Sequence, residues 1–209
     1  MDPSPSLYFA LDLLVLVKPK VGIIGAGNVG SALKKGLERA SYDVRAVGKE
    51  PNRVSEIARW AEIIVLAVPF SALNETLREV GNSADGKIVI DVTNVYTPEA
   101  IASLGSTSGA EVLQKKLPRA KLVKTLNMHF AKNMETGHCA GEQLTCFAAG
   151  DDKSAKAKVL ELTRDLGFDA VDAGPLANAK LLESLGNLNI QLGFNLGLGS
   201  DIGFKLVRA

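Results

Sequence analysis

Short apolar runs alternate with amphipathic stretches along most of this chain. The runs are rich in Val, Ile, Leu and Ala, and they cover 20–25, 43–48, 62–68, 87–92, 121–126, 145–150 and 168–174. Between them, 29–40 and 153–167 carry apolar residues three and four positions apart, which predicts helices. Strands that alternate with helices form βαβ units, and almost wholly apolar strands are typical of a parallel sheet covered on both faces. The pattern therefore predicts an α/β fold with a doubly wound parallel sheet.

The two ends of the chain follow other patterns. From Ala177 to about Leu196 the sequence predicts one long helix, so we expect a sheet domain over 20–174 and a small C-terminal helical cap over 175–209. The apolar run 7–17 contains Asp12, is too short to span a bilayer and lacks the basic start of a secretory signal. We expect 1–19 to be a leader or an added strand, with no membrane role.

Composition narrows the classes of partner. Of 209 residues, 46% are apolar, and 24 basic residues almost balance 23 acidic ones, so neither nucleic acid nor an anionic membrane is expected to bind. Only two cysteines occur, at a spacing that fits no common zinc or redox motif, which favours a reducing, cytoplasmic setting.

A small cluster of histidines and cysteines, His129, His138, Cys139 and Cys146, raises the question of a metal site. Their spacing suits no standard site, so we expect partly buried side chains and no metal. His129 is the better functional candidate, because it follows a predicted strand at its carboxyl end, where a polar group could touch a substrate.

The turn after the first predicted strand carries the clearest motif. Gly25, Gly27 and Gly30 form G-x-G-x-x-G between a strand and a helix, with Ala26 inside the turn. Gly25 permits the sharp turn, Gly27 lets the backbone approach a pyrophosphate, and Gly30 lets the helix pack closely on the strand. The helix N-terminus then faces the phosphates. Rather than a tight turn without a ligand, the context predicts a dinucleotide-binding, Rossmann-type domain.

The end of the second strand bears on which dinucleotide binds. Enzymes that use NAD place an acidic residue there to hold the ribose 2′-hydroxyl. Here Gly48 leaves room for a 2′-phosphate, and Lys49 and Arg53 could neutralise it, which favours NADP(H). Glu50 keeps the alternative open, since its carboxylate would point to solvent or bind a ribose and admit NADH.

The third strand ends in Val68 and Pro69, where the crevice at the carboxyl ends of the strands should lie. An apolar wall at this place would flank the cofactor. A proline that starts a helix is an equally good and compatible interpretation.

Four segments give a more specific resemblance. They are "GIIGAGNVGSAL", "EIIVLAVPFSAL", "KIVIDVTN" with "KLVKTLN", and "DAGPLANAKLLESLGNLNIQL" followed by "GLGSDIGFKL". In these the chain resembles the NADPH-dependent reductases of the deazaflavin coenzyme F-420, which are also similar to the cytosolic oxidoreductase domain of six-transmembrane ferric reductases. The resemblance runs from about Lys20 to the C-terminus.

The resemblance implies direct hydride transfer between nicotinamide C4 and a deazaflavin ring, without a side chain as acid or base. It implies that Asn28 and Val29 bind the pyrophosphate through backbone N–H groups. Asn94 and Asn127 are expected near the nicotinamide, and the C-terminal helix is expected to form the other wall of the acceptor cleft. The chain departs from the family's pattern at two places. The family often has a Ser-Arg pair where this chain has Lys49 and Glu50, and the segment "NMHFAKNMETG" after the fifth strand is unusual for the family.

Three functions remain open at this point. The first is an NADP(H) oxidoreductase whose acceptor is coenzyme F-420 or a flavin. The second is a ferric or quinone reductase that uses a diffusible flavin, and the third is a dinucleotide-binding redox sensor without catalysis. An enzyme should have an open, ring-sized cleft beside the nicotinamide, whereas side chains should fill that space in a sensor. The apolar C-terminal helix also predicts a homodimer.

Overall fold

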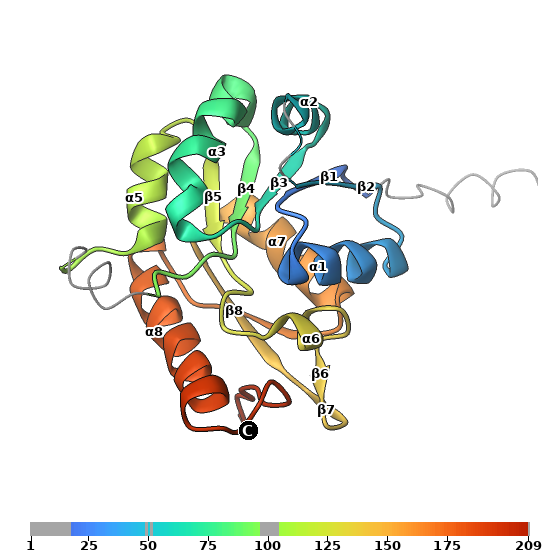
Figure 1. The fold of residues 1–209 in the computed structure, drawn as a ribbon, viewed down its shortest axis with the longest axis vertical. Coiled ribbons are helices and arrows are strands. Elements are labelled where there is room, and N and C mark those ends of the chain that lie inside the picture. The colour runs from blue at the N-terminus through green and yellow to red at the C-terminus, as the bar shows by residue number, and fades with distance from the viewer. Residues whose placement is uncertain (1–17, 49, 51, 97–104, 209) are drawn as a thin grey trace, which may run out of the picture.

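The structure, a computed structural model, describes residues 18–48, 50, 52–96 and 105–208. Seven strands form one sheet in the order β2-β1-β3-β4-β5-β8-β9 (Figure 1). Their bounds are β1 Val21–Ile24, β2 Val44–Val47, β3 Ile63–Leu66, β4 Ile88–Asp91, β5 Lys121–Lys124, β8 Thr145–Gly150 and β9 Asp169–Asp172. Each strand lies inside one of the predicted apolar runs, and the α/β fold of Rossmann type is confirmed.

The strand directions differ from the prediction at one place. Strands β2, β1, β3, β4 and β5 pair in parallel, but β8 runs antiparallel to β5, and β9 then pairs parallel to β8. Since β2 lies on one side of β1 and β3 on the other, the winding changes direction between β1 and β3. In open α/β sheets ligands bind at such a switch point, at the carboxyl ends of the strands.

Helices cover both faces of the sheet (Figure 1). Alternate residues of one strand enter opposite cores: Ile63 and Val65 pack with residues of α1 and α7, whereas Ile64 and Leu66 pack with residues of α2, α3 and α5. The helices are α1 Asn28–Arg39, α2 Arg53–Trp60, α3 Leu73–Val80, α5 Gly109–Lys116, α6 Ala131–Met134, α7 Lys153–Asp165 and α8 Ala179–Ile190, with short 3-10 turns η1 Phe70–Ala72, η2 Gly81–Ala84 and η3 Leu176–Asn178. Burial on both faces explains why the strands are apolar throughout.

The predicted C-terminal helix is a composite. It starts with η3, continues as α8 and ends in a π-helical turn, η4 Gln191–Asn195. The tail after it returns to the sheet, where the amide of Thr145 donates to the carbonyl of Phe204 at 2.9 Å. A two-stranded hairpin of β6 His138–Cys139 and β7 Glu142–Gln143 was not predicted.

Two remaining expectations concern the ends of the chain and the membrane. Most of the expected leader, 1–17, lies outside the described residues. Of the helices that the structure describes, none is long and apolar enough to cross a bilayer.

Candidate functional site

The glycine turn joins β1 to α1 at the switch point of the sheet. A Cβ atom at Gly25, whose φ is +118°, would lie 2.2 Å from the carbonyl oxygen of Ala67. A Cβ at Gly30 would lie 1.7 Å from the carbonyl oxygen of Gly25. At Gly27, by contrast, a Cβ would meet nothing within 4 Å. The outer two glycines are therefore required by packing, while the middle one borders open space.

That open space lies at the N-terminus of α1. Gly27 is the N-cap residue, no side chain caps the helix there, and its first turn contains no acidic residue. The amides of the first helical turn, beginning with Asn28 and Val29, have no acceptor four residues earlier in the helix. Uncapped amides at the positive end of a helix dipole fit a phosphate group. The residues present therefore suit the pyrophosphate of a dinucleotide.

The crevice beside this turn is closed by the end of β3. The amide of Ala67 donates to the carbonyl of Ile24 at 2.8 Å, which fixes the two strand ends against each other. Val68 is half-buried, and the exposed Pro69 is the N-cap of η1. Val68 thus lies beside the glycine turn, with its amide nitrogen 3.1 Å from where a Cβ of Gly25 would stand, and Pro69 starts a helical turn. Contact of this segment with a cofactor stays a prediction.

The end of β2 carries the residues predicted to read the adenosine ribose. Lys49 lies outside the described residues. Arg53 is the first residue of α2, and its guanidinium lies 3.5 Å from Glu56 of the same helix, with about half of each side chain exposed. Glu50 turns back on the strand, because its Oε2 accepts a hydrogen bond of 2.7 Å from the amide of Gly48. A carboxylate thus stands at the end of β2.

Asn94 and Asn127, the two residues predicted near the nicotinamide, form a reciprocal pair. Asn94 Nδ2 donates to the carbonyl of Asn127 at 2.7 Å, and Asn127 Nδ2 donates to Asn94 Oδ1 at 2.8 Å. Asn127 Nδ2 also donates to the carbonyl of Leu182 in α8 at 2.9 Å. The side-chain oxygen of Asn127 is buried and has no partner among the described residues. The side chain of Asn127 is therefore fixed in orientation, while its Oδ1 stays available as a hydrogen-bond acceptor.

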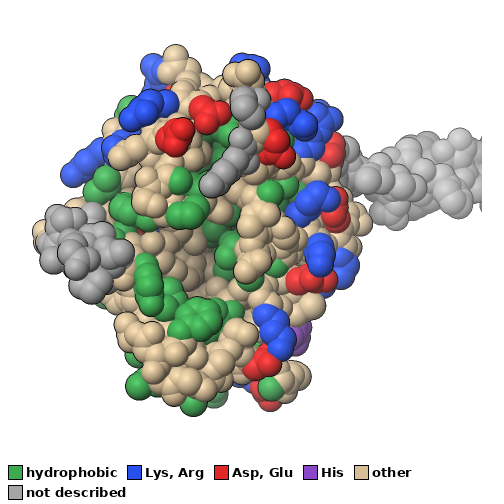
Figure 2. Space-filling view, viewed as in Figure 1, with side chains coloured by type: hydrophobic (Ala, Val, Ile, Leu, Met, Phe, Trp, Pro, Cys, Tyr) green, Lys and Arg blue, Asp and Glu red, His purple; other side chains and the backbone are tan. Residues whose placement is uncertain are grey.

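A cavity of about 530 Å³ opens beside this pair. In Figure 2 the face between α1, α6 and α8 is hollowed, and hydrophobic side chains gather around the hollow. The cavity is lined by Asn28, Val29, Val92, Asn94, Asn127, Met128, His129, Phe130, Ala131, Lys132, Met134, Gly186, Asn189, Ile190, Phe194 and Ser200. It thus begins at the first residues of α1 and reaches α8, as expected for a cleft whose far wall is the C-terminal helix.

Gly186 explains how α8 comes so close. A Cβ at this position would lie 2.8 Å from both the carbonyl oxygen of Asn127 and the Oδ1 of Asn94. Gly186, Asn189 and Phe194 line the cavity but were not among the predicted site residues. A glycine inside an otherwise helical pattern is a signal of close packing that could have identified this contact.

His129 lies deep in the cavity wall. It is 5% exposed, its ring centre is 4.6 Å from that of Phe168, and neither ring nitrogen has a hydrogen-bond partner among the described residues. Burial lowers the pKa of His129 to about 4. The ring is therefore neutral at physiological pH and cannot serve as a general acid there.

The other members of the histidine and cysteine cluster lie apart from the cavity lining. His138 is exposed and its Nδ1 lies 2.8 Å from the carbonyl oxygen of Thr136, while Cys139 is partly exposed. Cys146 is buried, and burial raises the pKa of its thiol to about 11. Across the described ranges, no group of three or more His, Cys, Asp or Glu side chains is placed to hold a metal ion.

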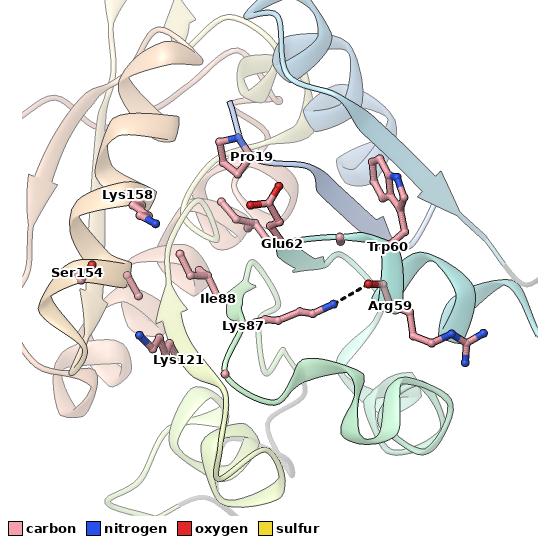
Figure 3. A pocket seen from close by; sticks show the side chains of 13 residues that line it. Pro19, Arg59, Trp60, Glu62, Lys87, Ile88, Lys121, Ser154 and Lys158 are labelled. Atoms are coloured by element: carbon pink, nitrogen blue, oxygen red, sulfur yellow. Dashed lines mark hydrogen bonds between the residues drawn. The ribbon is translucent and has the colours of Figure 1, made fainter. Parts of the chain in front are cut away.

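A second cavity, of about 400 Å³, lies at the opposite edge of the sheet, before the strands begin (Figure 3). Its wall includes Pro19, Trp60 and Lys87, and the Nζ of Lys87 donates to the carbonyls of Ala58 and Arg59 at 2.7 and 2.9 Å. Lys87 thus satisfies the C-terminal end of α2, which is a structural role. The amino edge of a doubly wound sheet is not where cofactors bind.

The fold is of Rossmann type, and the uncapped start of α1 opens onto a cavity of about 530 Å³. Comparison with known proteins agrees. The profile of the Rossmann-like domain matches residues 14–114. Rat metalloreductase STEAP3 is 29% identical over 180 residues, which cover 80% of this chain but only 36% of that protein. The F420-dependent NADP reductase of Methanothermobacter marburgensis is 28% identical over 180 residues, covering 82% of this chain and 80% of that protein.

Solved structures extend the similarity. A protein of Arthrobacter sp. FB24 that is assigned as an F420-dependent NADP reductase has a TM-score of 0.82 at 26% identity, covering 91% of this chain and 100% of that one. An imine reductase of Myxococcus stipitatus, at 20% identity and a TM-score of 0.63, shows the shared fold. The resemblance to the coenzyme F-420 reductases and to the metalloreductases is thereby confirmed. The relatives also support the prediction that the chain is an NADP-dependent oxidoreductase.

Proposed function

We propose that this protein is an NADP(H)-dependent oxidoreductase that transfers a hydride directly between the nicotinamide and a flat ring acceptor, coenzyme F-420 or a flavin. The observation that carries this proposal is the continuity of the cradle and the cavity. Asn28 and Val29 begin the uncapped helix α1 and also line the cavity of about 530 Å³. A dinucleotide whose phosphates lie on α1 would direct its nicotinamide toward Asn94 and Asn127.

An open cavity supports catalysis over the sensor alternative. Side chains would be expected to fill the space beside the nicotinamide if the protein only sensed the redox state of its ligand. Instead the space has a volume typical of small-molecule sites, with a few fixed polar groups in a mainly apolar wall.

The chemistry places modest demands on the protein. Bound NADPH supplies the hydride from its nicotinamide C4. The chain's own residues bind the phosphates at α1, orient the ring with the Asn94–Asn127 pair and exclude water with the apolar wall. The titratable residues in the described cavity lining are His129 and Lys132, and Lys132 pairs with Asp201 at 2.5 Å. Positioning of this kind can supply roughly 7–11 kcal/mol of a barrier without an acid or base.

The preference for NADP(H) rests on the relatives and on the cations predicted after β2. Gly48 has no side chain to crowd a 2′-phosphate, which Lys49 and Arg53 would neutralise, and Glu50 Oε2 lies 3.2 Å from where a Cβ of Gly48 would stand. The carboxylate of Glu50 on the amide of Gly48 opposes this preference, since it would repel a phosphate and could accept a ribose hydroxyl. We therefore propose NADP(H) as the main cofactor and Glu50 as the residue that would admit NADH.

A second candidate function is ferric reduction through a diffusible flavin. The similarity to rat metalloreductase STEAP3 favours it. Because this chain spans 36% of that protein's length, the transfer of that activity to this chain is itself a proposal. The same cavity would serve a flavin in both functions, so the acceptor must be found by experiment.

We also propose that the protein acts as a homodimer in a reducing, cytoplasmic setting. Large exposed apolar side chains concentrate on the outer face of α8 and on the segment after it: Leu181, Leu188, Leu196 and Leu198. Large apolar side chains that are exposed together on one segment are typical of an interaction site. Both cysteines are free thiols, which suits a reducing compartment.

A panel of acceptors tests the proposed function. The protein is mixed with NADPH or NADH and with coenzyme F-420, FMN, FAD, a quinone, or ferric chelate with and without flavin, and loss of nicotinamide absorbance is followed. Fast reduction of F-420 or a flavin by NADPH supports the proposal. Turnover only when ferric chelate and flavin are both present selects the second candidate. Tight NADPH binding without turnover on any acceptor leaves the sensor function.

A further inference from the structure

Three charged side chains meet in the interior, where the ends of β4 and β5 approach α8. Lys124 ends β5, and its Nζ lies 3.0 Å from Asp91 at the end of β4 and 3.2 Å from Glu183 of α8. Lys124 and Asp91 are register partners in adjacent strands, and both side chains are 0% exposed. Glu183 also accepts hydrogen bonds from the amides of Gly109 and Ala110 at 3.0 and 3.1 Å. The surplus negative charge thus faces the N-terminus of α5.

This ion network holds the turn that carries Asn94. The Nζ of Lys124 donates a hydrogen bond to the carbonyl of Thr93, and the amide of Thr93 donates to Asp91 Oδ1 at 2.9 Å. Both backbone groups of the residue before Asn94 are therefore fixed by the network. Asn94 in turn is locked to Asn127 by two hydrogen bonds.

The same network borders the turn that carries Asn127. Between Lys124 and Asn127 the chain passes through Leu126, whose φ of +62° lies in the left-handed region. A leucine rarely adopts this conformation, and such strain persists only where the surroundings enforce it. Buried contacts on both sides of Leu126 supply that constraint, since Lys124 is anchored in the network and Asn127 is anchored on Asn94.

The third element under control is α8, the far wall of the cavity. Glu183 is tied to Lys124, the neighbouring Leu182 accepts a hydrogen bond from Asn127, and Gly186 follows one turn later against the Asn94–Asn127 pair. One lysine is thus connected to all three segments that surround the predicted nicotinamide position.

We propose that Lys124, with Asp91 and Glu183, is a positioning residue for hydride transfer. The network sets the placement of the Asn94–Asn127 pair and of α8, and thereby the angle and distance at which the nicotinamide meets the acceptor. This inference rests on the proposed function. A network that only stabilised the fold would be buried in the same way. The test therefore measures stability and the positioning of the nicotinamide separately.

Near-isosteric variants make that separation. Glu183→Gln and Asp91→Asn each remove one carboxylate charge from Lys124. Asp91→Asn keeps an acceptor oxygen for the amide of Thr93. Glu183→Gln keeps an acceptor for only one of the amides of Gly109 and Ala110, which bind different oxygens of Glu183. Glu111→Gln is the matched control. Glu111 also caps α5, through Ser108 at 2.9 Å, but it is not among the partners of Lys124 in the described structure. Melting temperature, NADPH affinity by calorimetry, fluorescence of the bound nicotinamide and kcat at saturating NADPH are measured for each.

Positioning predicts a distinctive split. In Glu183→Gln and Asp91→Asn the affinity for NADPH should stay within about threefold of the parent's, because the phosphates bind elsewhere. The nicotinamide fluorescence should fall, and kcat should fall by roughly ten- to a hundredfold, as for a small misplacement of the reacting groups. The Glu111→Gln protein should keep the parent's kcat and nicotinamide fluorescence, even if its melting temperature falls as much as that of the other two variants. Parent-like kcat and fluorescence in folded Glu183→Gln and Asp91→Asn proteins would overturn the inference. A parent that does not bind NADPH would overturn the proposed function as well, and that failure is visible without any variant.

Discussion

The Gly27→Val substitution adds a branched side chain to the turn before α1, at the position where the structure leaves open space. Gly27 has φ −76° and ψ −165°, values that any residue can adopt, and a Cβ there meets nothing within 4 Å. A valine restricts the conformations of the unfolded chain, which raises the free energy of unfolding by roughly 0.4–1 kcal/mol. It is a poorer N-cap by about 1 kcal/mol. The two effects nearly cancel, so the melting temperature should change by less than about 4 °C.

The effect on cofactor binding should be much larger. The new side chain would occupy the place of the pyrophosphate and separate it from the amides of Asn28 and Val29. Hydrogen bonds to a charged group are worth roughly 1.5–3 kcal/mol each. Since 1.4 kcal/mol is tenfold in affinity, losing even one should weaken NADPH by about ten- to a hundredfold. NADH should lose as much, because both dinucleotides carry the pyrophosphate.

The measurement is calorimetric titration of NADPH into the parent, Gly27→Val and Gly30→Ala, with thermal unfolding of each. The Gly30→Ala protein is the contrasting control, because its Cβ would lie 1.7 Å from the carbonyl oxygen of Gly25, and it should lose stability instead. A folded Gly27→Val protein with the parent's affinity for NADPH would refute the phosphate-cradle interpretation.

Three further predictions follow from other parts of the site. The Lys49→Ala, Arg53→Ala double variant should bind NADPH about ten- to a hundredfold more weakly, with NADH hardly changed; equal losses, or a parent that prefers NADH because of Glu50, would refute the NADP(H) assignment. The pKa of His129 is lowered to about 4, so between about pH 6.5 and 4 the unfolded state binds a proton that the folded state does not. The free energy of unfolding should therefore fall as the pH drops through this range, by up to roughly 3 kcal/mol. The His129→Asn protein should lack this part of the pH dependence, and its turnover should fall by less than about a hundredfold. Leu188→Glu should convert a dimer into a monomer by light scattering, and a monomeric parent would contradict the proposed α8 interface.

Most of the sheet could be predicted because its strands are buried on both faces and therefore read as uninterrupted apolar runs. The glycine turn could be predicted because each glycine has a steric or ligand-related reason. The direction of β8 could not, since pairing is set by contacts far apart in the chain and leaves no local signal. The β6–β7 hairpin was missed because its strands have two residues each, His138–Cys139 and Glu142–Gln143.

The residues around the cavity also include some that could be predicted from the sequence and some that could not. Asn94 and Asn127 were expected near the cofactor from the resemblance, and the structure joins them by two hydrogen bonds. The ion network beneath them was not foreseen, because Lys124 and Glu183 are far apart in sequence. A charged residue that closes an otherwise apolar strand, as in "KIVID" and "KLVK", was the available signal.

Direct hydride transfer from the nicotinamide is the central claim, and isotope transfer tests it most directly. The protein is given NADPH deuterated at nicotinamide C4, on one face and then on the other, with oxidised coenzyme F-420, and the reduced deazaflavin is analysed by mass spectrometry. Our account predicts that deuterium from one face appears on the ring carbon of the acceptor, with a slower rate than for unlabelled NADPH. Solvent hydrogen at that carbon, or no reduction of a deazaflavin or flavin by a protein that binds NADPH, would contradict it.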